Sequence, residues 1–330
     1  MKSKAIIFSG VNQTDLIEFE LPSLGEDQIL IETKASCVSP GTELRCLAGK
    51  EGATGPFPFI PGYAPAGVVI AAGNKAKFAV GDKVISNGIR SAPGISCKWG
   101  GHSQYVVTSS DDALPIPNGL DFESAAISIV MAIPMRGILL AQPQKGETVS
   151  IIGLGLIGNL SARIFAALGT DVMAFDLSEE RVKAARAAGI KAYVIENNSL
   201  IETAKKYRPE GADIAVDCTG VPQITEQSLE LCRELSWEAT TEKGPRFIVQ
   251  GTYGADVKFP YGAAFARELT IYFPRDRRKS DMADALQFLT EKKGVISESD
   301  TAKFKPEEHV KAYELLRTGK LSALTAVFQW

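Results

Sequence analysis

A glycine-rich turn between a strand and a helix constrains this chain more than any other feature of its sequence. The apolar run TVSII (148–152) leads directly into GLGLIG and then into a helix-forming segment. Gly153 allows a tight turn, Gly155 lets the backbone approach a pyrophosphate, and Gly158 lets helix and strand pack closely. Free N–H groups at the start of the helix favour an anion there. The residues predicted to bind a dinucleotide are therefore Gly153, Gly155, Leu156, Ile157 and Gly158.

An acidic residue at the end of the next strand-like run indicates which dinucleotide is bound. Asp176 closes the run DVMAFD, 18 residues beyond Gly158. An acid about 20 residues after such a turn binds the ribose hydroxyls and repels a 2′-phosphate, so Asp176 predicts NAD rather than NADP. Arg181 leaves an alternative open, because it is either a contact for a 2′-phosphate or an exposed helix residue.

The order of strand-like and helix-like runs predicts an α/β chain of two domains. Residues 1–124 contain short strand-like runs separated by Gly and Pro, which indicates a β-rich domain. Residues 125–274 alternate strands with helices, as in a doubly wound parallel sheet. The six predicted strands are 148–153, 171–176, 191–195, 213–220, 246–251 and 268–273. Residues 275–330 hold two amphipathic helices and a final strand, LTAVFQW, that we expect to return to the first domain.

The composition excludes several classes of function. The net charge of −3 gives no electrostatic reason to bind nucleic acid or an anionic membrane. The most apolar stretch, 125–140, is interrupted by Ser128, Pro134 and Arg136, so no membrane span is predicted. Five widely spaced cysteines and an N-terminus that begins as a strand predict a cytoplasmic protein with reduced thiols.

Several short motifs in this order resemble the medium-chain dehydrogenase/reductase superfamily over nearly the whole length. They include Gly41-Thr42-Glu43, Pro61-Gly62, Val80-Gly81-Asp82, Asp217-Cys218-Thr219-Gly220 and the GLGLIG turn. The resemblance implies a GroES-like catalytic domain, a six-stranded Rossmann domain and an active site between them. It also implies that Thr219 and Gly220 bind the cofactor, and that the strand at 268–273 pairs with a second copy to form a homodimer.

Zinc-dependent members of this superfamily hold their catalytic metal with residues that this chain lacks. The first ligand position is Pro40, or Ser39 if the alignment slips by one, and the second is Tyr63 in Pro61-Gly62-Tyr63. The third falls in the apolar stretch 131–134, and Cys97 alone remains of the structural zinc cluster. Zinc requires sulfur, imidazole or carboxylate ligands, so we predict that no metal is bound.

Without a metal, a side chain must carry the proton that accompanies hydride transfer. Thr42 stands where the family has a hydroxyl relay, although a turn or helix-cap role is equally open. Tyr63 is either a proton donor or an aromatic plug for the vacated metal site, and His102 is either an acid/base or a structural histidine. The predicted catalytic residues are Thr42, Tyr63 and His102, while the role of Glu43 stays open.

Two arginines are candidate ligands for an anionic substrate. Arg45 stands where relatives have an outer relay histidine, but it cannot shuttle a proton because it stays charged. Arg275 begins a basic segment, RDRRK (275–279), after the last Rossmann strand. Arginine binds carboxylate or phosphate in a bidentate manner, whereas a solvated role is the alternative for both residues.

The sequence thus predicts a metal-free, NAD-dependent dehydrogenase or ketoreductase acting on a secondary alcohol or ketone. The Ser-Pro-Gly-Thr-Glu run (39–43) resembles the branch of bacteriochlorophyllide hydroxyethyl dehydrogenases. One alternative is a catalytically inactive NAD(H)-binding sensor or structural protein. Another is a zinc-less enoyl or quinone reductase, although those relatives generally have an alanine-rich turn and prefer NADPH.

Overall fold

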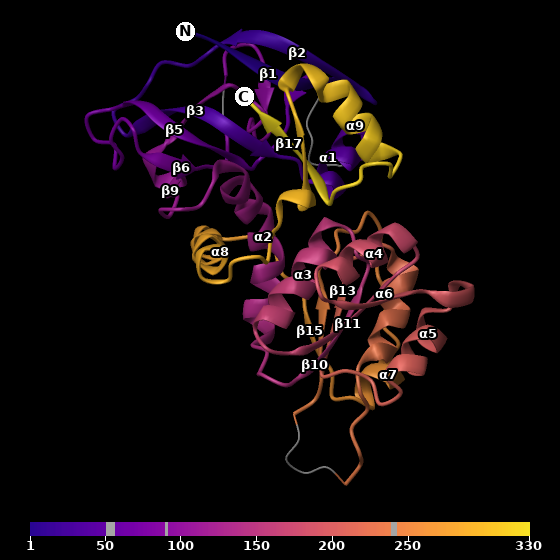
Figure 1. The fold of residues 1–330 in the computed structure, drawn as a ribbon. Helices are drawn as coiled ribbons and strands as arrows, with labels where there is room; N and C mark the ends of the chain where they lie inside the picture. Colours follow the sequence, from indigo (N-terminus) through magenta and orange to yellow (C-terminus); the bar gives the residue numbers. More distant parts are fainter. Residues whose placement is uncertain (51–56, 90–91, 239–242) are drawn as a thin grey trace. The chain divides into compact units, whose positions relative to one another are not determined.

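A computed structural model describes residues 1–50, 57–89, 92–238 and 243–330 (Figure 1). The chain divides into two compact units. Unit 1 comprises Met1–Val130 and Met282–Trp330, and unit 2 comprises Met131–Asp281. The boundaries expected from the sequence, after 124 and after 274, lie a few residues before these. Mixed sheets in one unit and a parallel sheet in the other give the α/β fold class that the sequence predicts.

Unit 1 is built on two sheets. A four-stranded sheet has the order β2-β1-β4-β7, and a seven-stranded sheet has the order β16-β17-β3-β5-β6-β9, with β8 paired to β3. The strands of the first sheet are β1 (Lys2–Gly10), β2 (Gln13–Glu20), β4 (Phe59–Ile60) and β7 (Ser96–Cys97). Those of the second are β3 (Gln28–Cys37), β5 (Pro65–Ala72), β6 (Lys83–Ile85), β8 (Tyr105–Ser109), β9 (Leu114–Pro115), β16 (Thr301–Phe304) and β17 (Thr325–Gln329).

The core of unit 1 follows from alternation along its strands. In β3, Ile29 and Ile31 point to one face and are almost fully buried, as period-two patterning requires. A second cluster is aromatic: Phe8 makes edge-to-face contacts with Phe59 and Tyr313 at ring distances of 5.4 and 5.2 Å. Such pairs add stability beyond the apolar area they bury.

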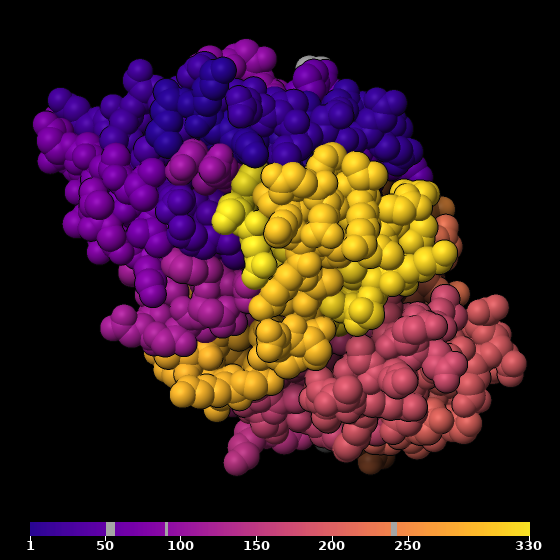
Figure 2. Space-filling model, turned by 45° about the horizontal axis from the view of Figure 1, so that its top comes forward, coloured from indigo at the N-terminus to yellow at the C-terminus, as the bar shows by residue number. Residues whose placement is uncertain are grey.

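The C-terminal segment completes unit 1. β17 pairs antiparallel with β3, and β16 pairs parallel with β17, as the expected return of the chain requires. The helix α9 (His309–Arg317) packs on β2 and on the helix α1 (Pro40–Leu47). The space-filling view shows the C-terminal residues, in yellow, lying against the N-terminal ones, in indigo (Figure 2).

Unit 2 is a parallel sheet of six strands in the order β12-β11-β10-β13-β14-β15, with helices on both sides (Figure 1). This is the doubly wound order. Successive strands are added on one side of β10 and then, from β13 onward, on its other side. In such sheets ligands bind at the carboxyl ends of the strands, at the point where the strand order reverses. The strands are β10 (Thr148–Ile152), β11 (Asp171–Asp176), β12 (Lys191–Val194), β13 (Ile214–Asp217), β14 (Arg246–Val249) and β15 (Thr270–Tyr272). The helices are α3 (Leu156–Ala167), α4 (Glu179–Ala187), α5 (Leu200–Tyr207), α6 (Pro222–Ser228) and α7 (Tyr261–Phe265).

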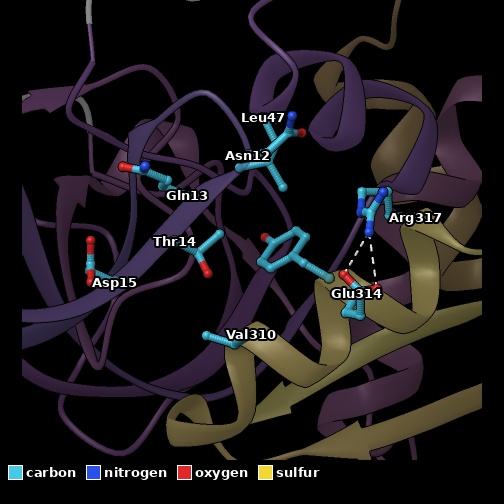
Figure 3. Close-up of a pocket in the computed structure, with 9 residues that line it drawn as sticks. Asn12, Gln13, Thr14, Asp15, Leu47, Val310, Glu314 and Arg317 are labelled. Carbon is cyan, nitrogen blue, oxygen red and sulfur yellow. Dashed lines mark hydrogen bonds and ion pairs between the residues drawn. The ribbon is translucent and has the colours of Figure 1, made fainter.

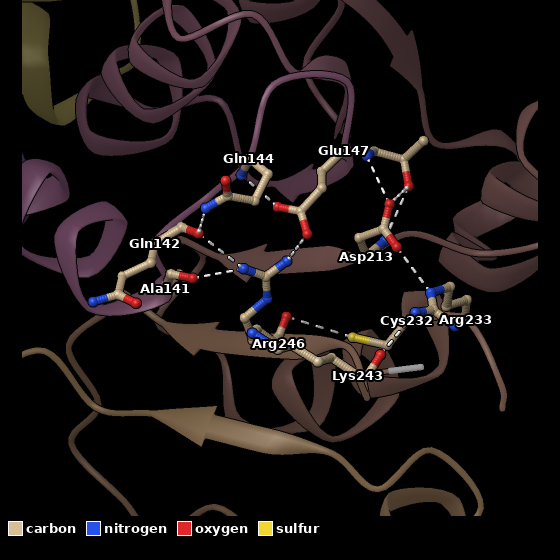
Figure 4. Close-up of polar contacts among 10 residues, drawn as sticks. Ala141, Gln142, Gln144, Glu147, Asp213, Cys232, Arg233, Lys243 and Arg246 are labelled. Atoms are coloured by element: carbon tan, nitrogen blue, oxygen red, sulfur yellow. Dashed lines mark hydrogen bonds and ion pairs between the residues drawn. The ribbon is translucent and has the colours of Figure 1, made fainter. Parts of the chain in front are cut away.

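The amino edge of this sheet is held together by a polar network (Figure 4). Arg246, which begins β14, forms an ion pair with Glu147 and donates to the Ala141 carbonyl at 2.7 Å. Asp213 accepts hydrogen bonds from the backbone and hydroxyl of Thr148 and, at 2.8 Å, from Arg233 Nε. These contacts join the polar groups of several segments at the amino end of the strands.

Two helices contain the boundaries between the units. α2 spans Phe122–Ala141, and α8 spans Lys279–Glu291. α2 is a continuous helix with Pro134 inside it. By length and composition alone α2 is apolar enough to cross a membrane, but 72% of its most apolar window is buried within the protein. A buried core helix has the same composition, so α2 gives weak evidence for a membrane span.

Candidate active site

The glycine turn lies at the carboxyl end of β10, and each glycine has a different reason to be there. Gly153 has a φ of +85°, a conformation that side chains disfavour. Gly155 is the N-cap of α3, and a Cβ built on it would meet no atom within 4 Å. A Cβ on Gly158 would lie 1.7 Å from the Gly153 carbonyl oxygen. Gly155 therefore leaves open space beside the turn, while Gly158 is needed for the fold itself.

The start of α3 presents unused backbone donors. The first helical hydrogen bond runs from the Asn159 N–H to the Gly155 carbonyl at 2.9 Å. The N–H groups of Leu156, Ile157 and Gly158 precede it and, as in every helix, have no partner within the helix. A positive dipole end and free N–H groups favour a phosphate at this position.

Asp176 is braced against the same turn. Its Oδ2 accepts from the Leu154 N–H at 2.6 Å and its Oδ1 from the Ser178 N–H at 2.8 Å. A carboxylate has about four acceptor sites, so these two bonds orient Asp176 and leave capacity for a diol. Arg181, whose role the sequence left open, lies 3.6 Å from Asp176 Oδ2 and forms an ion pair with it.

A second turn follows β13, where Thr219 and Gly220 were predicted to bind the cofactor. Both the N–H and the hydroxyl of Thr219 donate to Asp217 Oδ1, at 2.8 and 2.7 Å. Gly220 has a φ of +68°, and a Cβ there would lie 2.8 Å from the Thr252 carbonyl oxygen. Both predicted residues thus belong to a turn of fixed conformation at the carboxyl edge of the sheet.

Asp217, which the sequence analysis did not select, organises this second turn. It is fully buried, and its Oδ2 accepts from the hydroxyls of Thr225 and, at 2.8 Å, Tyr253. Burial and the Asp217 carboxylate raise the pKa of Tyr253, so this phenol stays a hydrogen-bond donor. Asp217 is the first residue of the Asp-Cys-Thr-Gly motif, and this position is the sequence feature that could have indicated its role.

Glu43 is the centre of the polar side chains in unit 1. It lies in the first turn of α1 and is 0% exposed. Its Oε1 accepts from the Ser39 N–H at 2.8 Å, and its Oε2 contacts His102 Nε2 at 2.9 Å and the Tyr313 hydroxyl at 2.6 Å. Burial and the Glu43 charge raise the pKa of Tyr313 well above its usual range, so Tyr313 donates to the carboxylate.

His102 is held from both sides and has no exposed surface. Its Nδ1 lies 2.8 Å from Ser36 Oγ, which also accepts from Trp330 Nε1 at 2.9 Å. The ring packs edge-to-face on Phe328 at 5.2 Å, and Gly62 leaves it room, since a Cβ there would lie 2.6 Å from the imidazole. In this conformation both ring nitrogens of His102 contact protein groups.

Tyr63 joins the same cluster through Ser39. Its hydroxyl donates to Ser39 Oγ at 2.6 Å, and its ring, 3% exposed, packs edge-to-face on Trp99 at 5.5 Å. Tyr63 therefore fills space with its ring and also makes a polar contact with its hydroxyl. We call this set the Glu43 cluster: Ser36, Ser39, Glu43, Tyr63, His102, Tyr313 and Trp330.

The other predicted residues lie outside the Glu43 cluster. Thr42 is half-buried in the first turn of α1, where Ser39 and not Thr42 is the N-cap, so the cap role considered for Thr42 is wrong. Arg45 is half-buried in the last turn of α1. Arg275 is exposed and follows β15, at the carboxyl edge of the parallel sheet.

The positions at which zinc-dependent relatives bind metal offer no suitable donors. Pro40 has none, Tyr63 uses its hydroxyl on Ser39, and Met131 and Ala132 are apolar and fully buried. Within the described parts of the chain, no three His, Cys, Asp or Glu side chains are grouped closely enough to hold a metal ion. The residues present therefore do not fit the catalytic zinc that the resemblance implies.

A cavity of about 320 Å³ lies elsewhere in unit 1, between β2 and α9 (Figure 3). Its walls include Thr14, Asp15, Val310, Tyr313, Glu314 and Arg317, with Arg317 bonded to both oxygens of Glu314. None of the residues predicted from the sequence lines it. Tyr313 is the one member of the Glu43 cluster that borders this cavity.

Comparisons with known proteins identify the class of this chain. Residues 25–118 match the alcohol dehydrogenase GroES-like domain, and residues 153–291 match the zinc-binding dehydrogenase family. The chain belongs to the medium-chain dehydrogenase/reductase superfamily, as the sequence motifs predicted.

Individual relatives are distant but match over nearly the full length. The chain is 25% identical to the uncharacterized zinc-type alcohol dehydrogenase-like protein YphC of Escherichia coli (strain K12), covering 98% of each chain. It is 25% identical to a sorbitol dehydrogenase of Halalkalibacterium halodurans, covering 91% of each. Among solved structures, the short chain alcohol dehydrogenase rspB of Escherichia coli CFT073, complexed with NADH, has a TM-score of 0.85 at 19% identity, covering 100% of this chain and 99% of that one. The last similarity shows a shared fold.

Proposed function

We propose that this protein is a metal-independent, NAD(H)-dependent oxidoreductase that interconverts a secondary alcohol and a ketone. The observation that carries the proposal is the open glycine turn at the start of α3 with the Asp176 carboxylate beside it. A nicotinamide cofactor bound there accepts or delivers the hydride. Alcohol and sorbitol dehydrogenases among the relatives support the same reaction class.

The proposed residues for NAD(H) are those of the two turns in unit 2. The N–H groups of α3 would bind the pyrophosphate, and Asp176 would bind the ribose hydroxyls, with Thr219 and Gly220 at the neighbouring turn. Asp176 disfavours a 2′-phosphate because two negative charges would approach each other in a poorly solvated site. Arg181 reduces that repulsion only in part, since its own side chain is 56% exposed.

Metal independence is proposed from the chemistry of the donors. Proline, methionine and alanine cannot replace thiolate, imidazole or carboxylate ligands. Elemental analysis should find well under one zinc per chain, and chelators should leave turnover unchanged. Stoichiometric zinc would show that the alignment of Pro40 and Tyr63 with the ligand positions is incorrect.

For the proton, we propose Tyr63 and Thr42 as the groups that touch substrate, although in this conformation Tyr63 is itself 3% exposed and its hydroxyl donates to Ser39. Tyr63 has a hydroxyl that can exchange a proton with a carbonyl oxygen, and the Thr42 hydroxyl can relay one. His102 is completely buried with both ring nitrogens in use, so we assign it a positioning role through Glu43. Arg45 and Arg275 are proposed to bind an anionic group of the substrate.

The test is turnover of NAD with a panel of secondary alcohols, with and without a carboxylate or phosphate. Tyr63→Phe should lower kcat at least about 10²-fold while the affinity for NADH stays within a few-fold. Tyr105→Phe, a phenol of unit 1 outside the Glu43 cluster, should turn over normally. Equal turnover in the wild type and Tyr63→Phe would mean that Tyr63 does not carry the proton.

One observation favours a second candidate function. Because the only histidine in the Glu43 cluster has no exposed surface, a non-catalytic NAD(H)-binding sensor remains the alternative. It predicts tight NADH binding with no turnover of any alcohol or ketone in the panel.

We also propose a homodimer formed along β15. This strand ends the parallel sheet, and unpaired edge groups favour strand pairing. The large exposed side chain of Phe273, which directly follows β15, supports an interface at this strand. A monomer by light scattering at micromolar concentration would refute the proposal.

A further inference from the structure

A series of hydrogen-bonded residues runs through the Glu43 cluster. It begins at Trp330 Nε1, which donates to Ser36 Oγ at 2.9 Å, and Ser36 Oγ lies 2.8 Å from His102 Nδ1. Its second half starts at His102 Nε2, 2.9 Å from Glu43 Oε2. Ser39 N–H then donates to Glu43 Oε1 at 2.8 Å. Tyr63 ends the series by donating to Ser39 Oγ at 2.6 Å.

The donor and acceptor capacities give this series a direction. The Trp330 indole can only donate, so the Ser36 hydroxyl proton is free to point at His102 Nδ1. Glu43, as a carboxylate, accepts every bond it makes, which places a proton on His102 Nε2. With a proton on His102 Nε2, the ring donates to Glu43 and accepts at Nδ1 from the Ser36 hydroxyl.

Burial makes each of these bonds matter. Ser36, Glu43 and His102 are all 0% exposed. If one partner is lost, bulk water cannot readily take its place, and the remaining polar group pays a desolvation cost. Tyr313 supplies the remaining bond to Glu43 and is itself 2% exposed. Its loss would leave a buried carboxylate oxygen with one donor fewer.

Both Tyr313 and Trp330 come from the segment that follows unit 2 in the sequence. Tyr313 lies on α9 and Trp330 directly follows β17, whereas Glu43 and Tyr63 belong to the first 63 residues. The two parts of unit 1 thus meet at this cluster, and the late part fixes side chains of the early one.

We propose that Tyr313 and Trp330 are positioning residues for the Tyr63 phenol, acting through Glu43, His102, Ser36 and Ser39. The effect of this positioning on turnover rests on the proposed function. The structural coupling of Tyr313 and Trp330 to Tyr63 does not. In this arrangement the two residues touch no substrate; they hold Ser39, and Ser39 holds the hydroxyl of Tyr63.

The coupling can be measured without activity because the chain has two histidines and eight tyrosines. Protein labelled with ¹⁵N-histidine and ¹³Cζ-tyrosine gives separate NMR signals, assigned with His309→Gln and Tyr63→Phe. Trp330→Phe and Tyr313→Phe should each move the His102 nitrogen signals and the Tyr63 carbon signal. The His309 signals should stay in place, which controls for a general change in fold.

Two substitutions serve as matched controls. Trp237→Phe removes an indole that is 87% exposed in unit 2, and Tyr105→Phe removes a phenol outside the cluster. Neither should move the signals of His102 or Tyr63. An unmoved Tyr63 signal in both Trp330→Phe and Tyr313→Phe would overturn the proposal, as would a wild-type His102 that is unprotonated at Nε2.

Turnover separates this proposal from the proposed function. If the wild type oxidises an alcohol, Trp330→Phe and Tyr313→Phe should lower kcat by about 2- to 30-fold and shift its pH profile, with the affinity for NADH unchanged. A moved Tyr63 signal with an unaltered pH profile and kcat would overturn the positioning role. If the wild type has no turnover, the proposed function fails, while the two NMR signals still decide whether Tyr313 and Trp330 position Tyr63.

Discussion

The turn after β10 in unit 2 and the Glu43 cluster in unit 1 are both polar, but different parts of the chain supply their polar groups. At the turn the donors are backbone N–H groups, and the glycines serve to keep side chains away. In the Glu43 cluster the donors and acceptors are mainly side chains, held in a space with no exposed surface at Glu43 or His102. A backbone site tolerates changes of side chain except where a Cβ collides, whereas a buried side-chain site depends on the charge and shape of every member.

The largest expected effect comes from Gly158, a glycine of the turn that the fold of unit 2 cannot replace. Gly158→Ala would place a Cβ 1.7 Å from the Gly153 carbonyl oxygen, so the turn must open. We expect unit 2 to lose about 3 kcal/mol or more, measured by denaturant unfolding. Gly155→Ala is the matched control: it should keep stability and lose only NADH affinity, since its Cβ meets no protein atom within 4 Å. A Gly158→Ala protein as stable as the wild type would contradict the difference between the two glycines.

In the Glu43 cluster the corresponding change is one of charge. Glu43→Gln replaces an acceptor by an amide, so a donor would face the donors of Tyr313, His102 or Ser39. Breaking such a buried set costs about 3 kcal/mol in the free energy of unfolding of unit 1. Glu20→Gln, at an exposed ion pair, should change it by less than about 1 kcal/mol. Similar losses for both variants would show that the Glu43 cluster does not contribute to stability.

A smaller effect is expected for cofactor selection at Asp176. The wild type should bind NADH at least tenfold more tightly than NADPH, about 1.4 kcal/mol. Asp176→Ala should narrow that ratio by relieving repulsion of the 2′-phosphate, as titration of both nucleotides would measure. Asp171→Ala changes an acid at the other end of the same strand and should leave the ratio unchanged. Equal affinities in the wild type would refute the role of Asp176.

The smallest expected effect is a difference between the two units in how their free energy of unfolding depends on pH. Burial lowers the pKa of His309 below its usual 6.5, so the unfolded chain takes up a proton that folded unit 1 does not. The stability of unit 1 should therefore fall as the pH drops from about 7 towards 5, and His309→Gln should remove that slope.

In unit 2, a hydrogen bond from Lys191 lowers the pKa of Asp171 below 3.8. Burial alone would raise the pKa of Asp213, but hydrogen bonds from Thr148 and Arg233 lower it. The contribution of both acids is present above about pH 4 and is lost only below it. Unfolding curves of each unit between pH 3 and 8 test whether unit 1 loses stability at a higher pH than unit 2. A loss of stability that begins in unit 2 as the pH falls would contradict the prediction.

The same comparison explains what could be predicted from the sequence. The turn at 153–158 was predictable because backbone geometry restricts its glycines to fixed spacings along one strand and one helix. The six parallel strands were likewise found from local patterns, within a few residues at each end. Glu43, His102 and Tyr63 were each noticed through the resemblance, but their contacts with one another were not predicted.

The reason is that the Glu43 cluster joins residues with no common spacing. Glu43 and Tyr313 are 270 positions apart, and Ser36 and Trp330 are 294 apart. A sequence pattern records only near neighbours, so Trp330 gave no signal at all. Asp217 was missed for another reason: it was quoted as part of a motif, but its hydrogen bonds to Thr219 depend on the conformation of the turn.

The insertion of unit 2 between the two parts of unit 1 has a consequence for synthesis on the ribosome. β3 gains its neighbour β17, and Ser36 its bond to Trp330, only after 294 further residues have been added. At about 5–20 residues per second this takes roughly 15–60 seconds. Throughout that time the nascent first part carries an open strand edge and a carboxylate at Glu43 that lacks Tyr313. The whole of unit 2 is synthesised before either Tyr313 or Trp330 is added. The part of the molecule that is made first is therefore the last to be completed, and it is the part that a chaperone would need to protect.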